Sequence, residues 1–362
     1  MSVEACFASS YQEARGKFLM AAQHQQLAQA EYLHPETGRD GEPLALDVAL
    51  AGDPAANRLL IISSACHGIE GYCGSGAQIA LINSPDWRAA MPPDCAVLYL
   101  HALNPYGFSW WRRTTHENID LNRNCHDFSQ PLPANPGYDR LAGLMLPATW
   151  PPSPANWLRL LGAGLRLGSL RALQGAISTG QFSHPNGLFY GGQAESWSLQ
   201  TIKSVLRRYA GHRSCVAWID IHSGLGPTGV GERIFACDYT AANIQRARAW
   251  WGDGVKSSAE GNSVSMVTGG QLWQSFYQAC PGVQYTGLGL EFGTQPLWKV
   301  LHALRGDHWL ALHPEASPAL QQSIRRKMFE AFFCNTGAWQ EAVVAQSKEA
   351  ASQALWGLAQ MV

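Results

Sequence analysis

The stretch RLLIISSACHGIE (58–70) decides the fold, because it runs from a buried strand directly into two polar side chains, His67 and Glu70. Its first part, RLLIISSA (58–65), is almost continuously apolar, which is typical of a central strand covered on both faces. A short helix, SGAQIALIN (75–83), and a second buried strand, CAVLYLHAL (95–103), are predicted to follow. This order of strand, loop, helix and strand predicts an α/β fold with parallel strands in its sheet.

The same alternation of strands and helices extends on both sides of this stretch. PLALDVAL (43–50) alternates apolar and polar residues, as a half-buried strand does, and the residues before about 40 are predicted to be helical and polar. Further strands are predicted at SCVAWIDIH (214–222) and VQYTGLGLEF (283–292), and further helices at 198–210 and 240–251.

Residues 131–187 interrupt this order, since they hold eight of the twenty prolines in the chain. A Leu-, Gly- and Arg-rich stretch, 158–174, is predicted to be one helix inside this segment. The segment is too short for a core of its own, so we expect an insertion or lid. The chain is therefore expected to be a single domain over 1–362, with a helical C-terminal tail from about 317.

Composition indicates which classes of partner are not favoured and in which cellular compartment the protein is expected. Lys plus Arg is 26 and Asp plus Glu is 27, so a net charge of -1 gives no general attraction to nucleic acid or to an anionic membrane. The longest apolar run is far below the roughly 18 residues that span a bilayer. The early Glu4, the absence of an apolar leader and nine scattered cysteines without a CxxC pair favour a cytoplasmic protein.

Acidic and imidazole groups follow the ends of three predicted strands. His67 and Glu70 follow the first, His222 ends the second, and Glu291 lies near the end of the third. In open α/β sheets the ligand crevice lies outside the carboxyl ends of the strands. Two histidines and a glutamate are a ligand set of catalytic zinc, which lowers the pKa of a bound water to about 7, and Glu291 could take that proton. Alone, HxxE is a weak signal, since such residues in a loop are usually only solvated.

Ordered motifs between these groups make the signal specific. The family-like elements are HGIE (67–70), NPYGF (104–108), WRR (111–113) and DLNRN (120–124), followed by the later histidine and glutamate. In these motifs the sequence resembles the zinc carboxypeptidase family, the carboxypeptidase A-like metallopeptidases, over about 58–128 and 214–295. It looks closest to an uncharacterised, mostly bacterial branch, a domain of unknown function. The resemblance implies a mixed, mostly parallel, twisted sheet of about eight strands with helices on both faces.

The resemblance also implies a metal centre and a base. His67, Glu70 and His222 would bind one zinc ion per chain. Asp120 would orient the first zinc-binding histidine, and Glu291 would be the general base and then the proton shuttle.

Cationic residues would complete the site. By the same resemblance, Arg112 would polarise the scissile carbonyl, and Asn122 with Arg123 would hold the terminal carboxylate of the substrate. The family has a tyrosine upstream of the catalytic glutamate that closes over bound substrate. Tyr277 and Tyr285 are the candidates here, but neither has a convincing sequence context.

Other polar groups carry weaker signals. Asp220 precedes His222 by two residues and shares its strand face, so it either orients that ligand or is simply buried and hydrogen-bonded. The glycine-rich loop 224–234 lacks the context of a dinucleotide site, but Glu232 and Arg233 within it could contact substrate. No GxSxG elbow supports a serine hydrolase. Metal binding is not favoured for four further histidines, His101, His116, His126 and His184.

The sequence thus predicts a zinc-dependent hydrolase of the metallocarboxypeptidase type, which cleaves an amide bond next to a free carboxylate. The expected substrate is a small peptide or an acyl-amino acid. One alternative is an N-acyl amino acid deacylase or amidase, which the insertion at 131–187 would suit. The other alternative is a non-catalytic protein that binds carboxylates.

Overall fold

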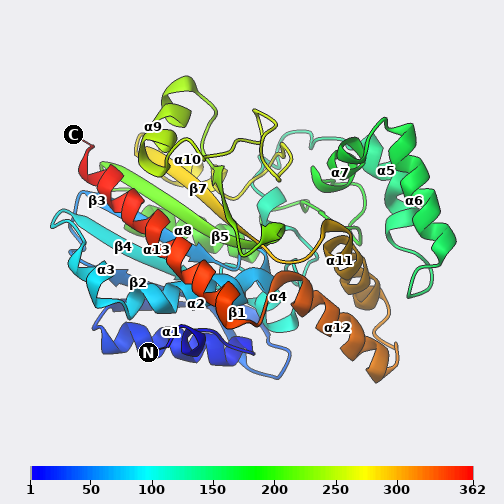
Figure 1. The fold of residues 1–362 in the computed structure, drawn as a ribbon, viewed down its shortest axis with the longest axis horizontal. Coiled ribbons are helices and arrows are strands. Elements are labelled where there is room, and N and C mark those ends of the chain that lie inside the picture. The colour runs from blue at the N-terminus through cyan, green and yellow to red at the C-terminus, as the bar shows by residue number, and fades with distance from the viewer. Residues whose placement is uncertain (1, 362) are drawn as a thin grey trace.

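The computed structural model describes residues 2–361, and a twisted mixed sheet forms its centre (Figure 1). Within these residues the sheet has seven strands in the order β1-β2-β4-β3-β5-β7-β6. The strands are β1 (Ala28–Thr37), β2 (Pro43–Ala51), β3 (Arg58–Ser64), β4 (Cys95–His101), β5 (Cys215–Thr228), β6 (Gly231–Phe235) and β7 (Gln284–Gly293).

Parallel pairing is confined to the middle of the sheet. β4, β3, β5 and β7 are parallel neighbours, whereas β1 and β2 on one side and β6 on the other pair antiparallel. The predicted α/β class and mixed sheet are confirmed, with seven strands in the described part of the chain against the expected eight or so. Three of the six pairings are antiparallel, so the parallel character belongs to the central strands, which carry the site.

Helices cover both faces of the sheet, as predicted. On one face lie α1 (Tyr11–His24), α2 (Gly71–Ile82) and α13 (Gly337–Ala359), and on the other lie α8 (Trp197–Tyr209) and α10 (Gln274–Ala279) (Figure 1). Leu60 and Ile62 of β3 belong to the apolar cluster of the first face, and Leu59 and Ile61 to that of the second. This alternation along one strand explains why its sequence is continuously apolar.

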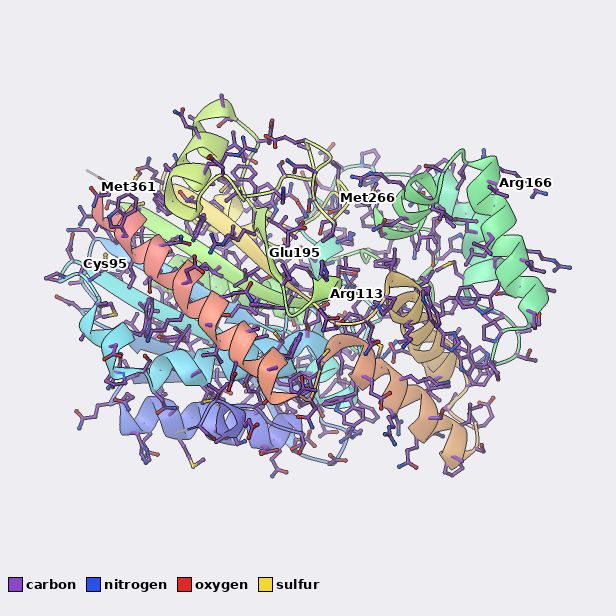
Figure 2. The ribbon with its side chains drawn as sticks, in the orientation of Figure 1. Cys95, Arg113, Arg166, Glu195, Met266 and Met361 are labelled. Carbon is purple, nitrogen blue, oxygen red and sulfur yellow. The ribbon has the colours of Figure 1, made fainter. Side chains whose placement is uncertain are left out.

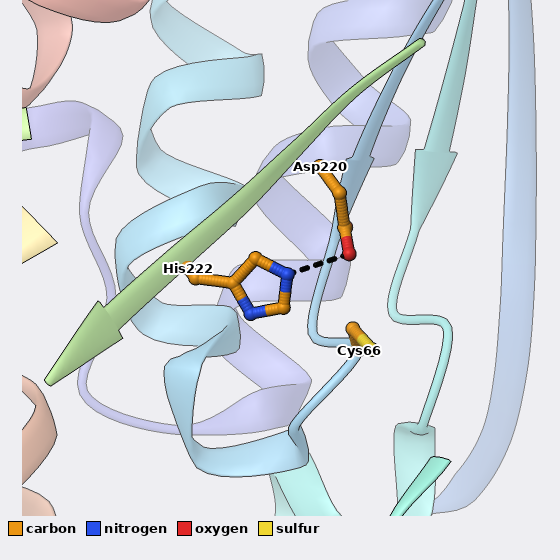
Figure 3. A group of neighbouring side chains, drawn as sticks. All are labelled: Cys66, Asp220 and His222. Atoms are coloured by element: carbon orange, nitrogen blue, oxygen red, sulfur yellow. Dashed lines mark hydrogen bonds and ion pairs between the residues drawn. The ribbon is translucent and has the colours of Figure 1, made fainter. Parts of the chain in front are cut away.

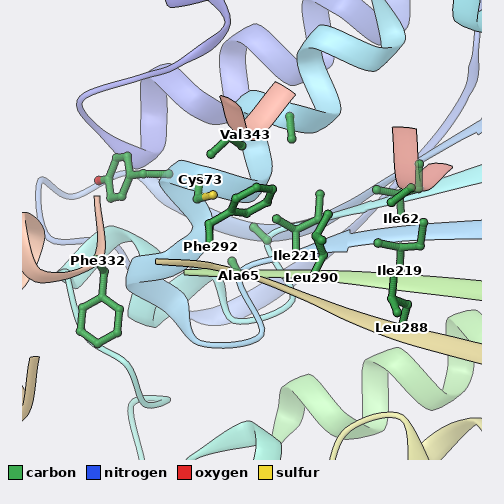
Figure 4. Packing of buried hydrophobic residues seen from close by; sticks show 14 of the residues in the cluster. Ile62, Ala65, Cys73, Ile219, Ile221, Leu288, Leu290, Phe292, Phe332 and Val343 are labelled. Atoms are coloured by element: carbon green, nitrogen blue, oxygen red, sulfur yellow. The ribbon is translucent and has the colours of Figure 1, made fainter. Parts of the chain in front are cut away.

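The core next to the site is built from residues in register on adjacent strands. Ile62 of β3 lies opposite Ile219 of β5, which lies opposite Leu288 of β7. Figure 4 shows these three side chains stacked across the sheet, with Ile221 and Leu290 continuing the row toward the strand ends. Because this register is fixed by burial on both faces, the polar residues that follow are brought to one edge.

The remaining elements are short or lie at the C-terminal side of the chain. They are the 3-10 helices η1 (Glu4–Cys6), η2 (Gly68–Glu70) and η3 (Leu121–Arg123), and the α-helices α3 (Pro85–Ala89), α4 (Pro105–Trp110), α9 (Ala241–Trp251), α11 (Leu297–Leu312) and α12 (Pro318–Phe332). α12 and α13 lie in the part of the chain, from about 317, for which a helical tail is predicted. None of the helices within residues 2–361 combines the length and the apolar character needed to cross a bilayer.

Two edge strands were missed. The helical prediction for the residues before about 40 is wrong beyond His24, because Ala28–Thr37 forms β1. β6, Gly231–Phe235, likewise lies at the end of a stretch that was expected to be a loop. Both are edge strands that are only partly buried, so neither carries the apolar pattern that identifies the inner strands.

The segment 131–187 contains three helices, α5 (Pro136–Met145), α6 (Pro154–Arg166) and α7 (Leu170–Ser178). The single helix predicted at 158–174 is wrong, because Gly168 has a positive φ of 92° and the Ser169 side chain caps a new helix. Buried side chains of these helices belong to the same apolar cluster as the first face of the sheet.

Candidate metal centre and active site

Three predicted metal ligands converge at the carboxyl ends of β3 and β5. His67 lies in the bend after β3, Glu70 in η2 and His222 within β5. His67 Nδ1 is 2.9 Å from Glu70 Oε1, His222 Nδ1 is 3.0 Å from Glu70 Oε2, and the two Nδ1 atoms are 3.3 Å apart. All three residues are buried, and their ligand atoms lie within 4.8 Å of one another. The donor set therefore fits a single zinc ion held by two imidazoles and a carboxylate.

Close backbone contact fixes the loop that carries two of these ligands. A Cβ on Gly68 would lie 2.1 Å from the carbonyl carbon of Gly107, so only glycine fits there. The Gly68 and Ile69 N–H groups donate to the carbonyls of Arg113 and Arg112. The HGIE and NPYGF motifs are therefore in contact at Gly68, and a Cβ on Gly107 would lie 2.7 Å from the carbonyl oxygen of Thr114, so this position is also restricted to glycine.

Carboxylates support both histidines from behind. The His222 ring lies with Nε2 2.7 Å from Asp220 Oδ2, and Asp220 Oδ1 accepts a hydrogen bond from Ser63 Oγ. His67 Nε2 lies 3.4 Å from Asp120 Oδ1 and 2.7 Å from Nη2 of Arg113, which itself donates to Asp120. In metal sites such partners fix the ring orientation so that the other nitrogen faces the metal. Asp220, which the sequence left open, therefore belongs to the site.

A second group of possible ligands shares His222. Figure 3 shows Cys66 and Asp220 beside its ring, with Nε2 hydrogen-bonded to Asp220, whereas Nδ1 lies 3.0 Å from Glu70 Oε2. Burial raises the pKa of the Cys66 thiol far above its usual value, so the sulfur stays protonated. We interpret this group as the support of His222, with Cys66 as a small buried side chain.

Charge compensation differs between the two glutamates of the site. Burial alone would raise the pKa of Glu70, but His67 and His222 hold it far below its usual value. Glu291 lies on β7 opposite His222, and its Oε1 accepts a hydrogen bond from the Leu225 N–H at 2.9 Å. Burial and the neighbouring Glu70 raise the pKa of Glu291 to about 8. Glu291 is thus a buried carboxyl group beside the ligands whose affinity for a proton is increased, which suits general acid–base chemistry.

The structure turns Arg113, and not Arg112, toward the metal ligands. Arg113 Nε lies 2.9 Å from Asp120 Oδ2 and its Nη1 lies 3.3 Å from Glu70 Oε1, and Figure 2 labels it near the end of β5. A pocket at the strand ends is lined by the three predicted ligands and Glu291. Arg112 does not line this pocket and instead pairs with Asp307 of α11 at 3.2 Å. α4 is followed by Trp111 in the left-handed region, with φ 58°, which redirects the chain at this point. The role expected for Arg112 therefore fits Arg113.

Asn122 and Arg123 line the pocket beside this centre. The Arg123 Nε and Nη2 groups donate to the Ser178 carbonyl, at 3.1 and 2.7 Å, and its Nη1 donates to the Asn122 carbonyl at 2.7 Å. Ser178 is the last residue of α7, where a cation is favoured by the free helix carbonyls. Since a guanidinium has five N–H donors, two remain for a ligand.

Neither candidate tyrosine is placed to close over a substrate. Tyr285 lines the pocket but is buried on β7 and stacked on Phe276, with ring centroids 4.3 Å apart. The Tyr277 hydroxyl accepts a hydrogen bond from the Asp238 N–H, and Tyr277 does not line the pocket. The structure thus gives no support to a tyrosine cover.

Glu232 and Arg233 do not reach the pocket either. The Glu232 carboxylate accepts a hydrogen bond from Ser263 Oγ, and Arg233 pairs with Glu349 of α13 at 2.8 Å. Both residues hold neighbouring loops and helices, so the structure gives no support to their contact with substrate. The pocket is also not lined by the four other histidines, His101, His116, His126 and His184.

Comparisons with known proteins agree with this fold. A family model described as "Protein of unknown function (DUF2817)" matches residues 7–346. No curated protein matches the chain. Among solved structures, bovine thrombin-activatable fibrinolysis inhibitor, in complex with tick carboxypeptidase inhibitor, is 12% identical with a TM-score of 0.54, and 98% of each chain is covered. A metallo-carboxypeptidase from Burkholderia cenocepacia is 11% identical with a TM-score of 0.47, covering 96% of this chain and 69% of its own. At such identities the first likeness shows the fold alone.

Proposed function

The chain belongs to the DUF2817 family and has a metallocarboxypeptidase-like fold, and we propose that it is a zinc-dependent hydrolase of amide bonds next to a free carboxylate. The observation that carries this proposal is the convergence of His67, Glu70 and His222 beside Glu291 in one pocket. When bound there, zinc would supply a Lewis acid that lowers the pKa of water to about 7.

Glu291 is proposed to be the residue that moves the proton. The Leu225 N–H donates to one carboxylate oxygen, Oε1, and the Glu291 side chain lines the pocket. A carboxylate in this position would take a proton from the attacking water and later give it to the leaving nitrogen.

The cations of the pocket are proposed to bind the two ends of the reacting group. Arg113, held by Asp120 and Glu70, would donate to the carbonyl oxygen as negative charge develops on it. Arg123, with its two remaining N–H groups, and Asn122 would bind the carboxylate next to the amide. The expected substrates are therefore short peptides and N-acyl amino acids.

A deacylase acting on N-acyl amino acids is the second candidate, and the pocket wall favours it. Helices α6 and α7 of the insertion line the pocket with leucine and isoleucine side chains, which would suit an acyl group. We also propose a cytoplasmic location, with no nucleic acid partner. The eight cysteines other than Cys6 are free thiols, and seven of these eight are buried, which is compatible with a reducing compartment.

Metal content and one base variant test the proposal. Wild-type protein should hold about one zinc per chain by elemental analysis, and His67→Ala should lose it. Glu291→Gln should keep zinc yet lose at least a factor of about 10² in turnover of acyl-amino acids or peptides.

Glu232→Gln is the matched control, since Glu232 lies opposite Glu291 across the β6–β7 pair but outside the pocket. Its turnover should stay within a few-fold of the wild type. Unchanged turnover in Glu291→Gln would refute the assignment of the base. Wild-type protein that holds no zinc even after zinc is added back would instead support the third possibility, a protein that only binds carboxylates. Turnover of longer peptides alone would rule out the deacylase.

A further inference from the structure

The charged and the apolar side chains that line the pocket lie on different parts of its surface. It has a volume of about 480 Å³, within the range of pockets that bind small molecules. Its charged and imidazole side chains all belong to the floor at the strand ends and the adjoining loops, and they are His67, Glu70, Arg113, Arg123, Asp220, His222 and Glu291. Any group that reacts at the metal ligands must therefore be polar, while the rest of the ligand meets a different surface.

The wall opposite the sheet carries no charge. It is formed by α6 and α7 of the insertion and by the start of α11, which lie beyond the strand ends in Figure 1. The apolar side chains that line it are Trp157, Leu160, Leu161, Leu170, Leu173 and Ile177 from the insertion, and Leu297, Trp298, Val300, Leu301 and Leu304 from α11. Most are aliphatic, which suits a flexible hydrocarbon chain.

Buried contacts join the two halves of this wall. Arg305 of α11 is fully buried and donates to the carbonyls of Leu144 and Met145 at the end of α5. Its guanidinium also lies 4.5 Å from the ring centre of Trp157 on α6. α11 and the insertion are thus fastened to each other through Arg305, so the two parts of the wall form one continuous surface.

The mouth of the pocket exposes large apolar side chains. Leu161 and Leu170 of the insertion are 51% and 66% exposed, and Leu297 and Trp298 of α11 are 49% and 62% exposed. Single exposed apolar side chains are ordinary, but three leucines and a tryptophan that line one opening form an apolar rim that continues the wall to the surface. A ligand that reaches from the floor to this rim has to be long and apolar at its outer end.

We propose that the site takes an amphiphilic amide: a polar, carboxylate-bearing head at the metal ligands and an unbranched hydrocarbon chain along the wall between the insertion and α11. The inference rests on the proposed function for the chemistry of the head, whereas the chain is assigned from the wall alone. The chain could belong to the acyl group or to the side chain of the amino acid that is released, and the test separates the two.

Binding to zinc-loaded Glu291→Gln protein tests the proposal without requiring turnover. Calorimetry would compare N-acetylglycine, N-hexanoylglycine and N-decanoylglycine, and in a second arm N-acetyl amino acids with side chains of matching length. Affinity should rise by about four-fold for each added methylene, the equivalent of about 0.8 kcal/mol, until the rim is reached. A rise in the first arm assigns the chain to the acyl group, and a rise in the second assigns it to the released amino acid.

Two double variants locate the chain. Leu161→Gln with Leu170→Gln alters the rim, while Leu158→Gln with Leu165→Gln alters two leucines that are at least as exposed, 69% and 81%, but do not line the pocket. The rim variant should lose about ten-fold in affinity for the longest chain and less than two-fold for the acetyl compound. The control should lose neither.

The outcomes separate this inference from the proposed function. Equal affinity for short and long chains in both arms, or an equal loss in both double variants, would overturn the inference even if acetyl compounds are hydrolysed. A steep dependence on chain length in a protein that never hydrolyses them would support the inference and remove the hydrolase.

Discussion

Removing the carboxylate behind His222 should weaken zinc binding by a predictable amount. Asp220 Oδ2 is 2.7 Å from His222 Nε2, and its Oδ1 accepts from Ser63 Oγ, which in turn accepts from Trp218 Nε1 at 2.7 Å. This chain of contacts holds the ring with Nδ1 toward Glu70. Loss of such a partner costs a factor of about 10 to 100 in metal affinity, or about 1.4 to 2.8 kcal/mol.

The contacts also predict an order among three variants. Asp220→Ala leaves the ring nitrogen without an acceptor and should fall at the 100-fold end. Asp220→Asn can still accept through its amide oxygen, at the cost of turning its NH₂ toward Ser63, and should lose about ten-fold. Ser63→Ala removes only a neutral donor to the carboxylate and should lose less than either. Titration of metal-free protein against a chromophoric zinc chelator measures all three.

A buried aspartate elsewhere provides the control. Asp307 is also ion-paired, with Arg112, but it contacts none of the three ligands. Asp307→Asn should therefore bind zinc as the wild type does, whatever it costs in stability. Zinc affinity within two-fold of the wild type in Asp220→Ala, or an equal loss in Asp307→Asn, would refute the reasoning.

Two further predictions concern the arginines and the metal. Arg113→Gln should lower kcat/KM by about 10² to 10³, as loss of an oxyanion donor does. Arg112→Gln should mainly lower the free energy of unfolding, by about 3 kcal/mol, because Asp307 loses its partner. Enzyme kinetics and urea unfolding of both variants check this, and the reverse pattern would return the oxyanion role to Arg112. Zinc at 100 times its Kd should raise the free energy of unfolding of metal-free wild-type protein by about 2.7 kcal/mol, but not that of His67→Ala. Thermal unfolding of both proteins with and without zinc measures this, and equal shifts in both would show that the metal binds elsewhere.

Burial explains which parts of the fold could be predicted. β3 is covered on both faces, so its apolar run identifies it, and the residues that follow are brought to the strand ends by register. His222 and Glu291 lie opposite each other for this reason, as residues at matching positions of neighbouring strands. The edge strands β1 and β6 face solvent along much of their length, so no comparable pattern marks them.

The choice between adjacent arginines shows where a motif stops being informative. The WRR motif places two cations side by side, but which one faces the ligands depends on the backbone at Trp111, which has a left-handed conformation that tryptophan rarely adopts. Asp307, the partner that draws Arg112 away, lies 195 residues further along the chain. Only the tertiary structure brings that partner into contact, so the sequence motif could not distinguish the two roles.

For the leucines of the insertion, the sequence shows the apolar pattern but does not show which surface each side chain forms. The Leu-, Gly- and Arg-rich stretch 158–174 is predicted from the sequence to be one helix. The break at Gly168 divides it into two helices, whose side chains have to serve both a shared core and the pocket wall. All four of these leucines, Leu160, Leu161, Leu170 and Leu173, line the pocket, but the first and last are buried whereas the middle two are exposed at its mouth. A site for a hydrocarbon chain therefore accounts for an insertion with more apolar side chains than its own packing requires.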